Sequence, residues 1–476
     1  MNSNVVKNIS KLFHKFGCYI KSNEVNMLIK KQPQDFTRVF KFPWYDVLYF
    51  LIFRSEKCIP SEITKYYCDI GKPELRISKQ AVFKAIKKVN PKVFPSLIHK
   101  FAEIFYQSKL VKNYHGYVLL AEDGTCNELR PSEKSLGSFG CILNQFITSA
   151  DKAKKATSKS AALYDVTNGL IVDFSMSPYR KSEIPIAIEH LQNSYSYFEN
   201  HKVIYLCDRY YGSIELFSIL EDYKFKYCVR AKDNYFKKYI SEMKSDDEWI
   251  TVTLDKAWLK RLKYEQPKKR FTENPTIRIR VVRYNYTYND KEGFTHHAKL
   301  MYFTNLSEKE FSRMDIVELY TKRWDIECSY KTLKTDYEWE RFFSVDCDSE
   351  ICSIFAKVLF HNINGIVRKE MNMTLEEFDL DECHKTYVTN IVQLSKMLRY
   401  THLCRYLRNK NKKAIERILN LIFDLKNKIK VPVRSNRHNQ RWGRHLNTSK
   451  PTRYRLDGRN WPNTSVVHGQ LRTVKP

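Results

Sequence analysis

The spacing of apolar residues predicts helices through most of the first hundred residues. The apolar run at residues 44–53 is too short to span a bilayer and contains Asp46, so we expect a buried helix there. Residues 61–71 begin at a serine that can cap a helix and end at a glycine. In residues 77–89, apolar side chains repeat along one face, and Ser78 can cap the helix.

This helical region also has a basic outer face. Lys79, Gln80 and Lys84 would point away from the apolar stripe of residues 77–89. Two short helices joined through a glycine are typical of a helix-turn-helix, which would place these three side chains against DNA. A small helical bundle with a basic surface gives the same pattern, so both interpretations stay open.

From Tyr117 the chain changes to short apolar runs typical of buried strands. A strand is predicted at 117–123 with a turn at Gly124, and two further strands flank Asn168-Gly169, which is a hairpin signal. Predicted helices at 182–198 and 213–223 then alternate with predicted strands at 202–208 and 225–231. This order predicts an α/β fold in which a mixed sheet has helices on its faces.

The alternation stops after residue 231. Period-two runs at 249–254, 276–290 and 296–306 predict a β-rich insertion. Helix is expected again after Leu306, where Ser307 and Glu310 have the spacing of a capping box. We therefore expect a helical N-terminal DNA-binding region at 1–110, a catalytic core at 111–231 and 307–345, the insertion at 232–306, a helical C-terminal region at 346–425 and a basic tail at 426–476.

The charge of the chain points to a polyanionic partner. There are 82 Lys and Arg residues against 53 Asp and Glu, which gives a formal net charge of +29. Nucleic acid is the natural partner, because contacts to phosphates release counterions. The last 51 residues hold thirteen Lys or Arg and one acid, Asp457, which favours phosphate contact over a merely solvated tail. An anionic membrane surface is the rival partner, although no basic amphipathic helix with a bulky apolar face stands out.

The N-terminus and the cysteines indicate where the protein works. Residues 1–17 lack an apolar core followed by a small-residue cleavage site, so we expect no signal peptide. The twelve cysteines are scattered and include no CxxC pair, which suits a reducing cytoplasm and gives no zinc-ligand set.

Two aspartates stand at predicted strand ends. Asp123 and Asp208 each follow a buried strand, and α/β sheets place their sites at the carboxyl ends of strands. Each aspartate also has an ordinary explanation. Asp123 could form a turn with Gly124, and Asp208 could cap the helix that begins near Ser213.

A third acid lies among basic residues at 318–334. On one helix, Tyr320, Arg323, Glu327 and Lys334 would fall within a sector about 60° wide. A separate stripe of Ile326, Tyr330 and Leu333 would pack on the sheet. A surface helix with a charge pair between Arg323 and Glu327 would explain the same residues.

Taken together, the three carboxylates suggest one site. Carboxylate oxygens suit Mg²⁺, and two metal ions can stabilise the attacking and leaving oxygens of an in-line phosphoryl displacement. Basic neighbours would then hold the nucleic-acid backbone, which explains why one glutamate is kept among bases.

Residues 320–334 resemble a known family signature. Tyr320, Arg323, Glu327 and Lys334 match the Y-x2-R-x3-E-x6-K signature of bacterial DDE transposases of the insertion-sequence-four family, and Trp324 also looks like that family. Asp123-Gly124-Thr125 resembles its first aspartate motif and Asp208-Arg209 its second, although Tyr210 takes the place of the usual glycine. The resemblance covers roughly residues 117–343.

The resemblance implies a fold, a cofactor and roles. It implies a ribonuclease-H-like core interrupted by a β insertion. Asp123, Asp208 and Glu327 would hold two Mg²⁺ ions, or two Mn²⁺ ions in their place. Tyr320, Arg323 and Lys334 would contact phosphates, and Trp324 would stack on or near a displaced base. It also implies cut-and-paste transposition by a homodimer on double-stranded DNA ends, in a bacterial cytoplasm at the nucleoid.

Two other functions share these features. A metal-dependent nuclease without strand transfer would use the same three acids. A DNA-binding protein that has lost catalysis would have lost at least one acid or signature base, and none of the seven signature and motif positions is lost.

Overall fold

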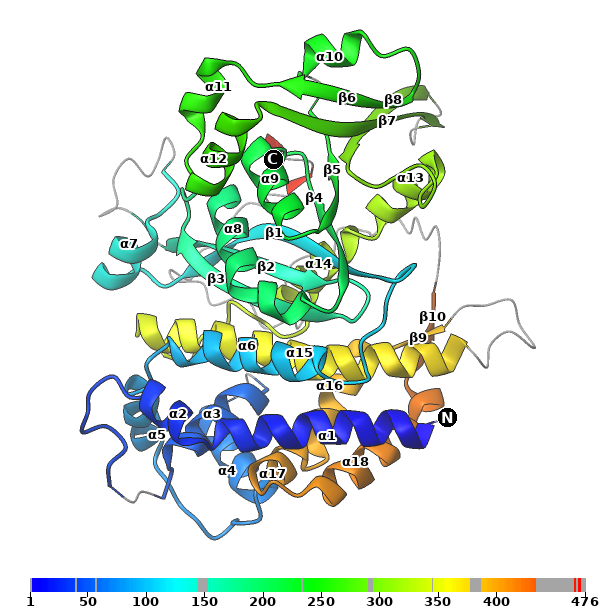
Figure 1. The fold of residues 1–476 in the computed structure, drawn as a ribbon. Coiled ribbons are helices and arrows are strands. Elements are labelled where there is room, and N and C mark those ends of the chain that lie inside the picture. The colour runs from blue at the N-terminus through cyan, green and yellow to red at the C-terminus, as the bar shows by residue number, and fades with distance from the viewer. Residues whose placement is uncertain are drawn as a thin grey trace.

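The computed structural model describes residues 2–38, 41–55, 58–143, 153, 155–232, 234–289, 294–344, 346–376 and 387–433 (Figure 1). It also describes two short strands, β11 (Val466–Val467) and β12 (Gln470–Leu471). Most of the expected basic tail therefore lies outside the described residues. Within them, no helix combines the length and the apolar character needed to cross a membrane.

The centre of the molecule is one eight-stranded sheet with the order β3-β2-β1-β4-β5-β8-β7-β6. β1 pairs antiparallel with β2 and parallel with β4, β2 pairs antiparallel with β3, and β4 pairs parallel with β5. This half of the sheet has the ribonuclease-H-like order. Its strands are β1 (Tyr117–Leu129), β2 (Ala156–Asp165), β3 (Leu170–Pro178), β4 (Lys202–Cys207) and β5 (Lys226–Arg230).

Two local predictions in this half have different outcomes. The hairpin between β2 and β3 is confirmed, and Gly169 has the positive φ of +70° that glycine tolerates in such a turn. The turn predicted at Gly124 is wrong. β1 continues to Leu129, because residues 120–129 pair with β2 along their whole length.

The segment 232–306 extends this sheet. β8 (Thr295–Thr304) pairs antiparallel with β5, and β7 (Thr276–Asn289) and β6 (Asp247–Thr253) follow in turn. The segment also contains helices α10 (Lys237–Ser241), α11 (Lys256–Arg261) and α12 (Glu265–Glu273). Its strands therefore continue the sheet of the ribonuclease-H-like half (Figure 1).

Helices cover the sheet and close its β3 edge. α8 (Glu183–Ser194) and α9 (Ile214–Asp222) pack on the strands, as do α13 (Arg313–Thr321) and α14 (Trp324–Thr335). α6 (Val93–Tyr106) and the long α15 (Cys347–Glu376) pack against β3. The Asn362 side chain of α15 accepts a hydrogen bond from Ile171 N and donates one to Ile171 O, both at 2.8 Å. These bonds satisfy backbone groups on an edge strand that would otherwise be unpaired.

Most of the remaining helices form a layer beyond α6 and α15, on the side away from the sheet (Figure 1). α1 (Asn2–Ile20) packs against α6 and α18 (Lys412–Asp424), so helices far apart in the sequence share this layer. The predicted buried helix at 44–53 is confirmed as α3 (Trp44–Phe53), and Ser78 caps α5 (Lys79–Lys87) as predicted. The other elements are α2 (Asn23–Leu28), α4 (Ile59–Asp69), α7 (Glu133–Phe139), α16 (Ile391–Tyr400), α17 (Leu403–Arg408), β9 (Tyr387–Thr389) and β10 (Lys430–Pro432).

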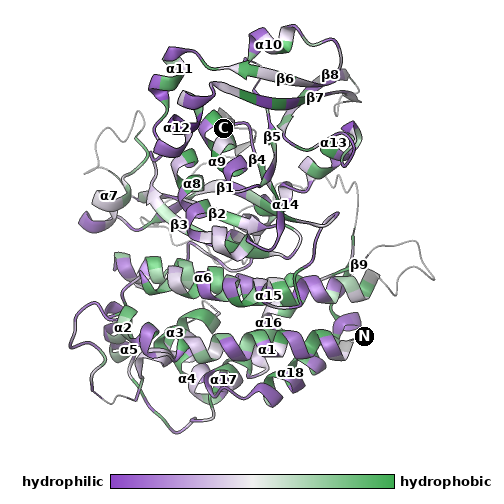
Figure 2. Cartoon of the chain, in the orientation of Figure 1, coloured by the Kyte–Doolittle hydropathy of each residue, from purple (hydrophilic) through white to green (hydrophobic). Residues whose placement is uncertain are grey.

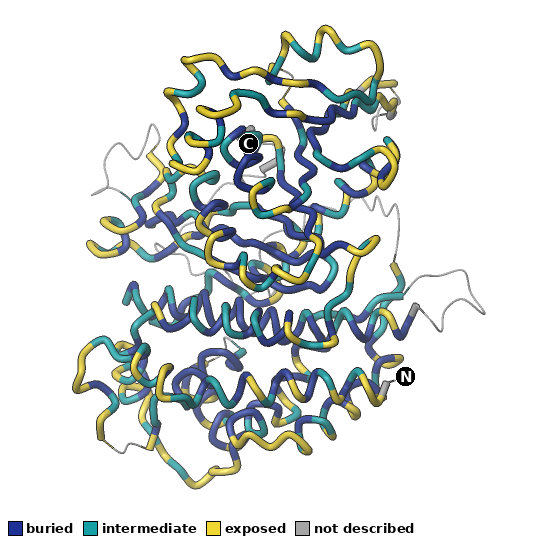
Figure 3. The backbone as a smooth tube through the Cα atoms, in the orientation of Figure 1, coloured by how far each residue is buried: buried dark blue, intermediate teal, exposed yellow. Residues whose placement is uncertain are grey.

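Apolar and buried positions coincide in the middle layers. Figure 2 shows hydrophobic residues concentrated in α6, α15 and the central strands, and Figure 3 shows the same elements as mostly buried. The exposed backbone lies in the outer helices and in the segment 232–306. The sheet end that holds the candidate site is thus supported by packed elements.

Candidate active site

Asp123 and Asp208 lie level with each other on neighbouring strands. The parallel pairing of β1 with β4 ends at Glu122 and Cys207, so the next residue of each chain segment is one of the aspartates. Asp208 ends β4, and its Oδ1 accepts a hydrogen bond of 2.7 Å from Tyr210 N. Asp123 is not at the end of β1, but it lies where the parallel ladder ends.

The segment that holds Glu327 is two helices rather than the single predicted helix. α13 ends at Thr321 and α14 begins at Trp324, with Lys322 and Arg323 between them in a tighter turn. The predicted start after Leu306 is also wrong, because α13 begins at Arg313 with a capping box of Ser312 and Asp315. Tyr320 therefore belongs to α13, whereas the other signature residues belong to or border α14.

Arg323 joins two of the three predicted acids. Its Nη2 lies 2.7 Å from Glu327 Oε1, and its Nη1 lies 3.8 Å from Asp123 Oδ2. The Arg323 side chain is only 10% exposed, so this bridge is shielded from solvent. Its Nε is buried and makes no hydrogen bond to any described group. A buried donor without an acceptor is costly, and it would suit an incoming phosphate oxygen.

The charge state of Asp123 follows from its surroundings. Burial raises the pKa of Asp123 to about 7, although the Arg323 guanidinium and a hydrogen bond from Gly124 N oppose the rise. The negative charges of Asp208 and Glu327 add to the rise. The three acids therefore lie within electrostatic range of one another, and their mutual repulsion calls for a cation.

The oxygen ligands of Asp123, Asp208 and Glu327 suit a divalent cation, but the three side chains do not converge on one point. Three carboxylates are the ligands that Mg²⁺ prefers. Within the described residues, no three acidic, histidine or cysteine side chains are gathered closely enough to hold a metal. Arg323 lies between two of the candidates, so its guanidinium takes the place that a cation would take.

The other signature residues surround this centre. Tyr330 donates a 2.7 Å hydrogen bond to Asp123 O, and Lys334 Nζ lies 2.7 Å from both Thr125 Oγ1 and Cys126 O. Both contacts hold α14 against β1. Tyr320 packs on Tyr302 with ring centroids 4.9 Å apart, and Trp324 is 57% exposed. The predicted packing stripe of Ile326, Tyr330 and Leu333 is confirmed as buried.

A model of the transposase DDE domain matches residues 116–363, which is just over half of the 476 residues. The chain belongs to the DDE transposase family. Among solved structures, it is similar to the piggyBac transposase in a synaptic complex with hairpin DNA, at 11% identity over 87% of this chain and 84% of that chain, with a TM-score of 0.40. Among curated proteins, no sequence matches the chain.

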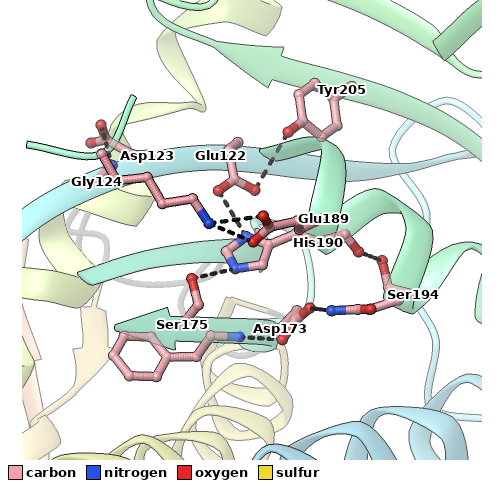
Figure 4. A network of polar contacts seen from close by, with 12 residues as sticks. Glu122, Asp123, Gly124, Asp173, Ser175, Glu189, His190, Ser194 and Tyr205 are labelled. Carbon is pink, nitrogen blue, oxygen red and sulfur yellow. Dashed lines mark hydrogen bonds and ion pairs between the residues drawn. The ribbon is translucent and has the colours of Figure 1, made fainter. Parts of the chain in front are cut away.

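The DDE domain also contains a buried polar network that the sequence did not predict. Glu122 is fully buried, and its Oε1 lies 2.9 Å from His190 Nδ1 of α8 (Figure 4). His190 Nε2 lies 2.9 Å from Ser175 Oγ of β3, and Tyr205 of β4 donates to Glu122. This network ties three strands and a helix together one residue before Asp123. A glutamate inside an apolar strand run was the available signal.

The DDE domain has a cationic pocket directly after Asp208. The pocket encloses about 340 Å³, and its lining includes Arg209, Tyr210, Arg230, Lys232 and Lys299. Tyr210 is 59% exposed, with Lys232 Nζ 4.8 Å from its ring centroid. The sequence did not predict this pocket, because its residues lie after β4, at the end of β5 and in β8, and their meeting depends on the strand order.

The predicted DNA-reading residues of the N-terminal region lie elsewhere. Lys79, Gln80 and Lys84 are exposed on α5, as the apolar stripe of that helix requires. α5 packs against α3, α4 and α15 in the outer helical region. The structure therefore does not bring these three residues into the site formed by β1, β4 and α14.

Proposed function

We propose that this member of the DDE family is a cut-and-paste DNA transposase of the insertion-sequence-four type. It cleaves DNA at terminal inverted repeats and joins the freed 3′ ends to target DNA. The observation that supports this most is the arrangement of Asp123 and Asp208 at the end of one parallel ladder, with Glu327 linked to Asp123 through Arg323.

Asp123, Asp208 and Glu327 would hold Mg²⁺, or Mn²⁺ in its place, as two ions. When bound, the ions would supply Lewis-acid stabilisation of the attacking and leaving oxygens. In this proposal the carboxylates must be ionised, so Asp123 gives up its proton as the cation arrives, and Arg323 leaves its bridge between the acids. The freed guanidinium would then be available to a phosphate oxygen of the DNA.

The neighbouring residues have separate roles in the proposal. Tyr330 and Lys334 fix α14 against β1, which holds Glu327 beside Asp123. Tyr320, Arg323 and Lys334 would contact the DNA backbone, and the exposed Trp324 would stack on a displaced base. The formal charge of +29 supports a DNA partner.

The proposal extends to the whole chain. Residues 1–110 would bind DNA, residues 111–231 and 307–345 would form the catalytic core, and 232–306 would be its insertion. The helical region 346–425 would help two copies to pair the transposon ends as a homodimer, and the tail at 426–476 would contact phosphates. Part of the DNA contact of residues 1–110 would come from α5, through Lys79, Lys84 and their neighbour Gln80.

A strand-transfer assay tests this function. The purified chain is incubated with Mg²⁺, a labelled duplex that carries the element's terminal inverted repeat, and a supercoiled plasmid. The proposal expects cleavage at the end of the repeat and covalent joining of its 3′ end to the plasmid, both abolished by EDTA. Cleavage without joining would point to a nuclease, and binding without either reaction would point to a DNA-binding protein that has lost catalysis.

A further inference from the structure

Two adjoining hollows lie on the surface of the helical region. The larger encloses about 650 Å³ between the start of α3, the end of α17 and the segments before α3 and after α4. The smaller encloses about 140 Å³ between α4 and the start of α5. Leu75 lines both hollows, so the two lie side by side. Six Lys and Arg residues line the two hollows, and Arg408 is paired with Asp46. The other five define what we call the basic groove: Arg38, Lys41, Lys72, Arg76 and Lys79.

The charge of the basic groove is not neutralised within the described part of the chain. All five of its cations are exposed. None of them forms an ion pair with a described acid. The one acid in the lining is Asp46, and Arg408 binds both of its oxygens at 2.5 and 3.0 Å. Because Arg408 already neutralises this acid, the five exposed cations are free to attract an anion of comparable length.

The basic groove is held in place by one buried tyrosine. The Tyr67 hydroxyl donates to Lys41 O at 3.1 Å, and Tyr67 O accepts from Lys72 N at 2.8 Å. Between them, Gly71 has φ of +76°, which lets the chain turn sharply at the end of α4. The backbones of Lys41 and Lys72 are therefore both anchored to Tyr67, which restrains the distance between them before any ligand binds.

Aromatic side chains line the larger hollow beside the cations. Phe36, Trp44 and Tyr45 are half-buried in its wall. Lys21 Nζ lies 4.4 Å from the centroid of the Tyr45 ring. Cations that follow a backbone next to aromatic surfaces are the combination that nucleic-acid sites use.

From these observations we infer that the basic groove is a second DNA-binding site, separate from the carboxylate centre. The inference rests on the proposed function, which supplies DNA as the substrate. The layer of α6 and α15 lies between the sheet and the helices around the groove (Figure 1). DNA held there is therefore not at the reacting phosphate, and the groove contacts the backbone of a duplex that extends away from the site. Backbone contacts carry no sequence information, so binding there is independent of base sequence.

Lysine footprinting tests the inference on the full-length protein. The chain is acetylated with and without DNA, and the modification of each lysine is measured by mass spectrometry. The probes are a 40-base-pair duplex from the end of the element, an unrelated duplex of the same length and the corresponding single strand. We expect modification of Lys41, Lys72 and Lys79 to fall several-fold with both duplexes. Lys256, Lys260 and Lys269 are exposed on α11 and α12 and serve as the reference, so they should change little.

The pattern of lysine protection shows which DNA the basic groove binds. Protection by both duplexes supports sequence-independent backbone contact, and protection by the end duplex alone would contradict it. Protection by the single strand alone would overturn a duplex site. No protection at the three groove lysines would overturn the inference, even if strand transfer is normal, so its failure is distinct from failure of the proposed function.

A variant with altered charge gives a second measurement. Arg38→Gln, Lys41→Gln and Lys72→Gln together should weaken duplex binding and lower the slope of log affinity against log salt by roughly 2 to 3. The matched control changes Lys256, Lys260 and Lys269 to Gln and removes the same charge from the other end of the molecule. Equal slopes for the two triple variants would contradict the inference. Thermal unfolding of both variants checks that they fold.

Discussion

Arg323 is the residue that most changes the picture of the site. The family resemblance implied a phosphate contact for it, whereas in the structure it bridges Asp123 and Glu327. A guanidinium between two carboxylates competes with any cation that those carboxylates would bind. The same side chain is therefore expected to oppose metal binding before DNA arrives and to assist catalysis afterwards.

Replacing Arg323 should raise the affinity for metal and lower the rate of DNA cleavage. We expect Arg323→Ala to bind Mn²⁺ several-fold more tightly in the absence of DNA, because one positive charge has left the site. DNA cleavage should fall, because the charge-assisted contact to phosphate is lost. Mn²⁺ binding can be followed by electron paramagnetic resonance, and cleavage by gel electrophoresis of a labelled duplex.

Lys322→Ala is the matched control for this pair of measurements. Lys322 precedes Arg323 and pairs with Glu318 at 3.7 Å rather than with a site carboxylate. Its removal should change Mn²⁺ affinity less than the removal of Arg323. Weaker Mn²⁺ binding by Arg323→Ala would show that the arginine supports the metal site instead of competing with it.

At the residue scale, the sequence singled out three candidate acids but not their geometry, and their role stays a prediction. Asp123, Asp208 and Glu327 were found because acids after apolar strands and an acid among bases are unusual. The pair of Arg323 with Glu327 was one of the alternatives left open, and it is present. The contact of Arg323 with Asp123 could not be predicted, because it depends on the packing of α14 against β1 through Tyr330 and Lys334. Glu122 and His190 were missed because their pairing joins positions 68 residues apart.

At the scale of elements, the close packing of α15 against the turn between β2 and β3 should contribute to the stability of the fold. Gly365 of α15 lies against the turn between β2 and β3, where a Cβ on Gly365 would come within 2.2 Å of Gly169 O. Gly365→Ala should push the helix from the turn and lower the free energy of unfolding by about 1–3 kcal/mol. Urea unfolding followed by circular dichroism measures the change.

Gly137→Ala is the control for that substitution. Gly137 is exposed in α7, and a Cβ there would meet no atom within 4 Å. Because alanine favours helix over glycine, this variant should be as stable as the parent or slightly more stable. An unchanged unfolding midpoint for Gly365→Ala would mean that α15 can shift without cost.

A second contact of α15 should make stability depend on pH. Glu350 Oε2 accepts a 3.2 Å hydrogen bond from Arg130 N, just after β1. Burial raises the pKa of Glu350 to about 8, although this hydrogen bond and the charge of Arg130 oppose the rise. Below its ordinary pKa the carboxyl is protonated in both states. As pH rises toward 8, the unfolded chain releases the proton and the folded chain does not, so stability falls.

Glu350→Gln removes this titration. Its free energy of unfolding relative to the parent should increase between pH 5 and pH 8, by roughly 2–4 kcal/mol. Above pH 8 the difference should level off, because the carboxyl is then ionised in both states. Urea unfolding at a series of pH values gives the comparison. A difference that is constant with pH would contradict the raised pKa.

At this scale, periodicity predicted the type of most elements but not all of their ends. The strands and helices from β2 to β5 are where the apolar runs placed them. The turn at Gly124 was wrong because ladder pairing with β2 overrides the local preference of Asp-Gly. The single helix at 318–334 was wrong because nothing in its sequence marks the break at Lys322 and Arg323.

At the scale of the whole molecule, the strand order shows how the segment 232–306 joins the rest of the sheet, which the sequence alone did not predict. The α/β class with a ribonuclease-H-like sheet is confirmed. The segment 232–306 was expected as an interruption, yet β8 pairs with β5 and prolongs the same sheet. That pairing brings Lys299 to Arg230 and Tyr210 and so creates the cationic pocket beside Asp208.

The helical layer shows the same limit, because it joins helices that are far apart in the sequence. α1 packs on α18, and Asp46 of α3 is paired with Arg408 of α17 across 362 residues. Local patterns predicted these helices, but they hold no information about which helices meet. The basic groove is one result, because its larger hollow lies between α3 and α17.

The most direct test of the account compares the parent chain with Glu327→Gln in one joining reaction. A labelled transposon-end duplex with a free 3′ hydroxyl is incubated with supercoiled plasmid and Mg²⁺, and duplex binding is measured on the same samples by fluorescence anisotropy. We predict labelled plasmid with the parent, and at least about a hundredfold less with Glu327→Gln at nearly unchanged binding. Undiminished joining by the variant would contradict the role of Glu327, and the absence of joining by a parent chain that binds the duplex would contradict the transposase itself.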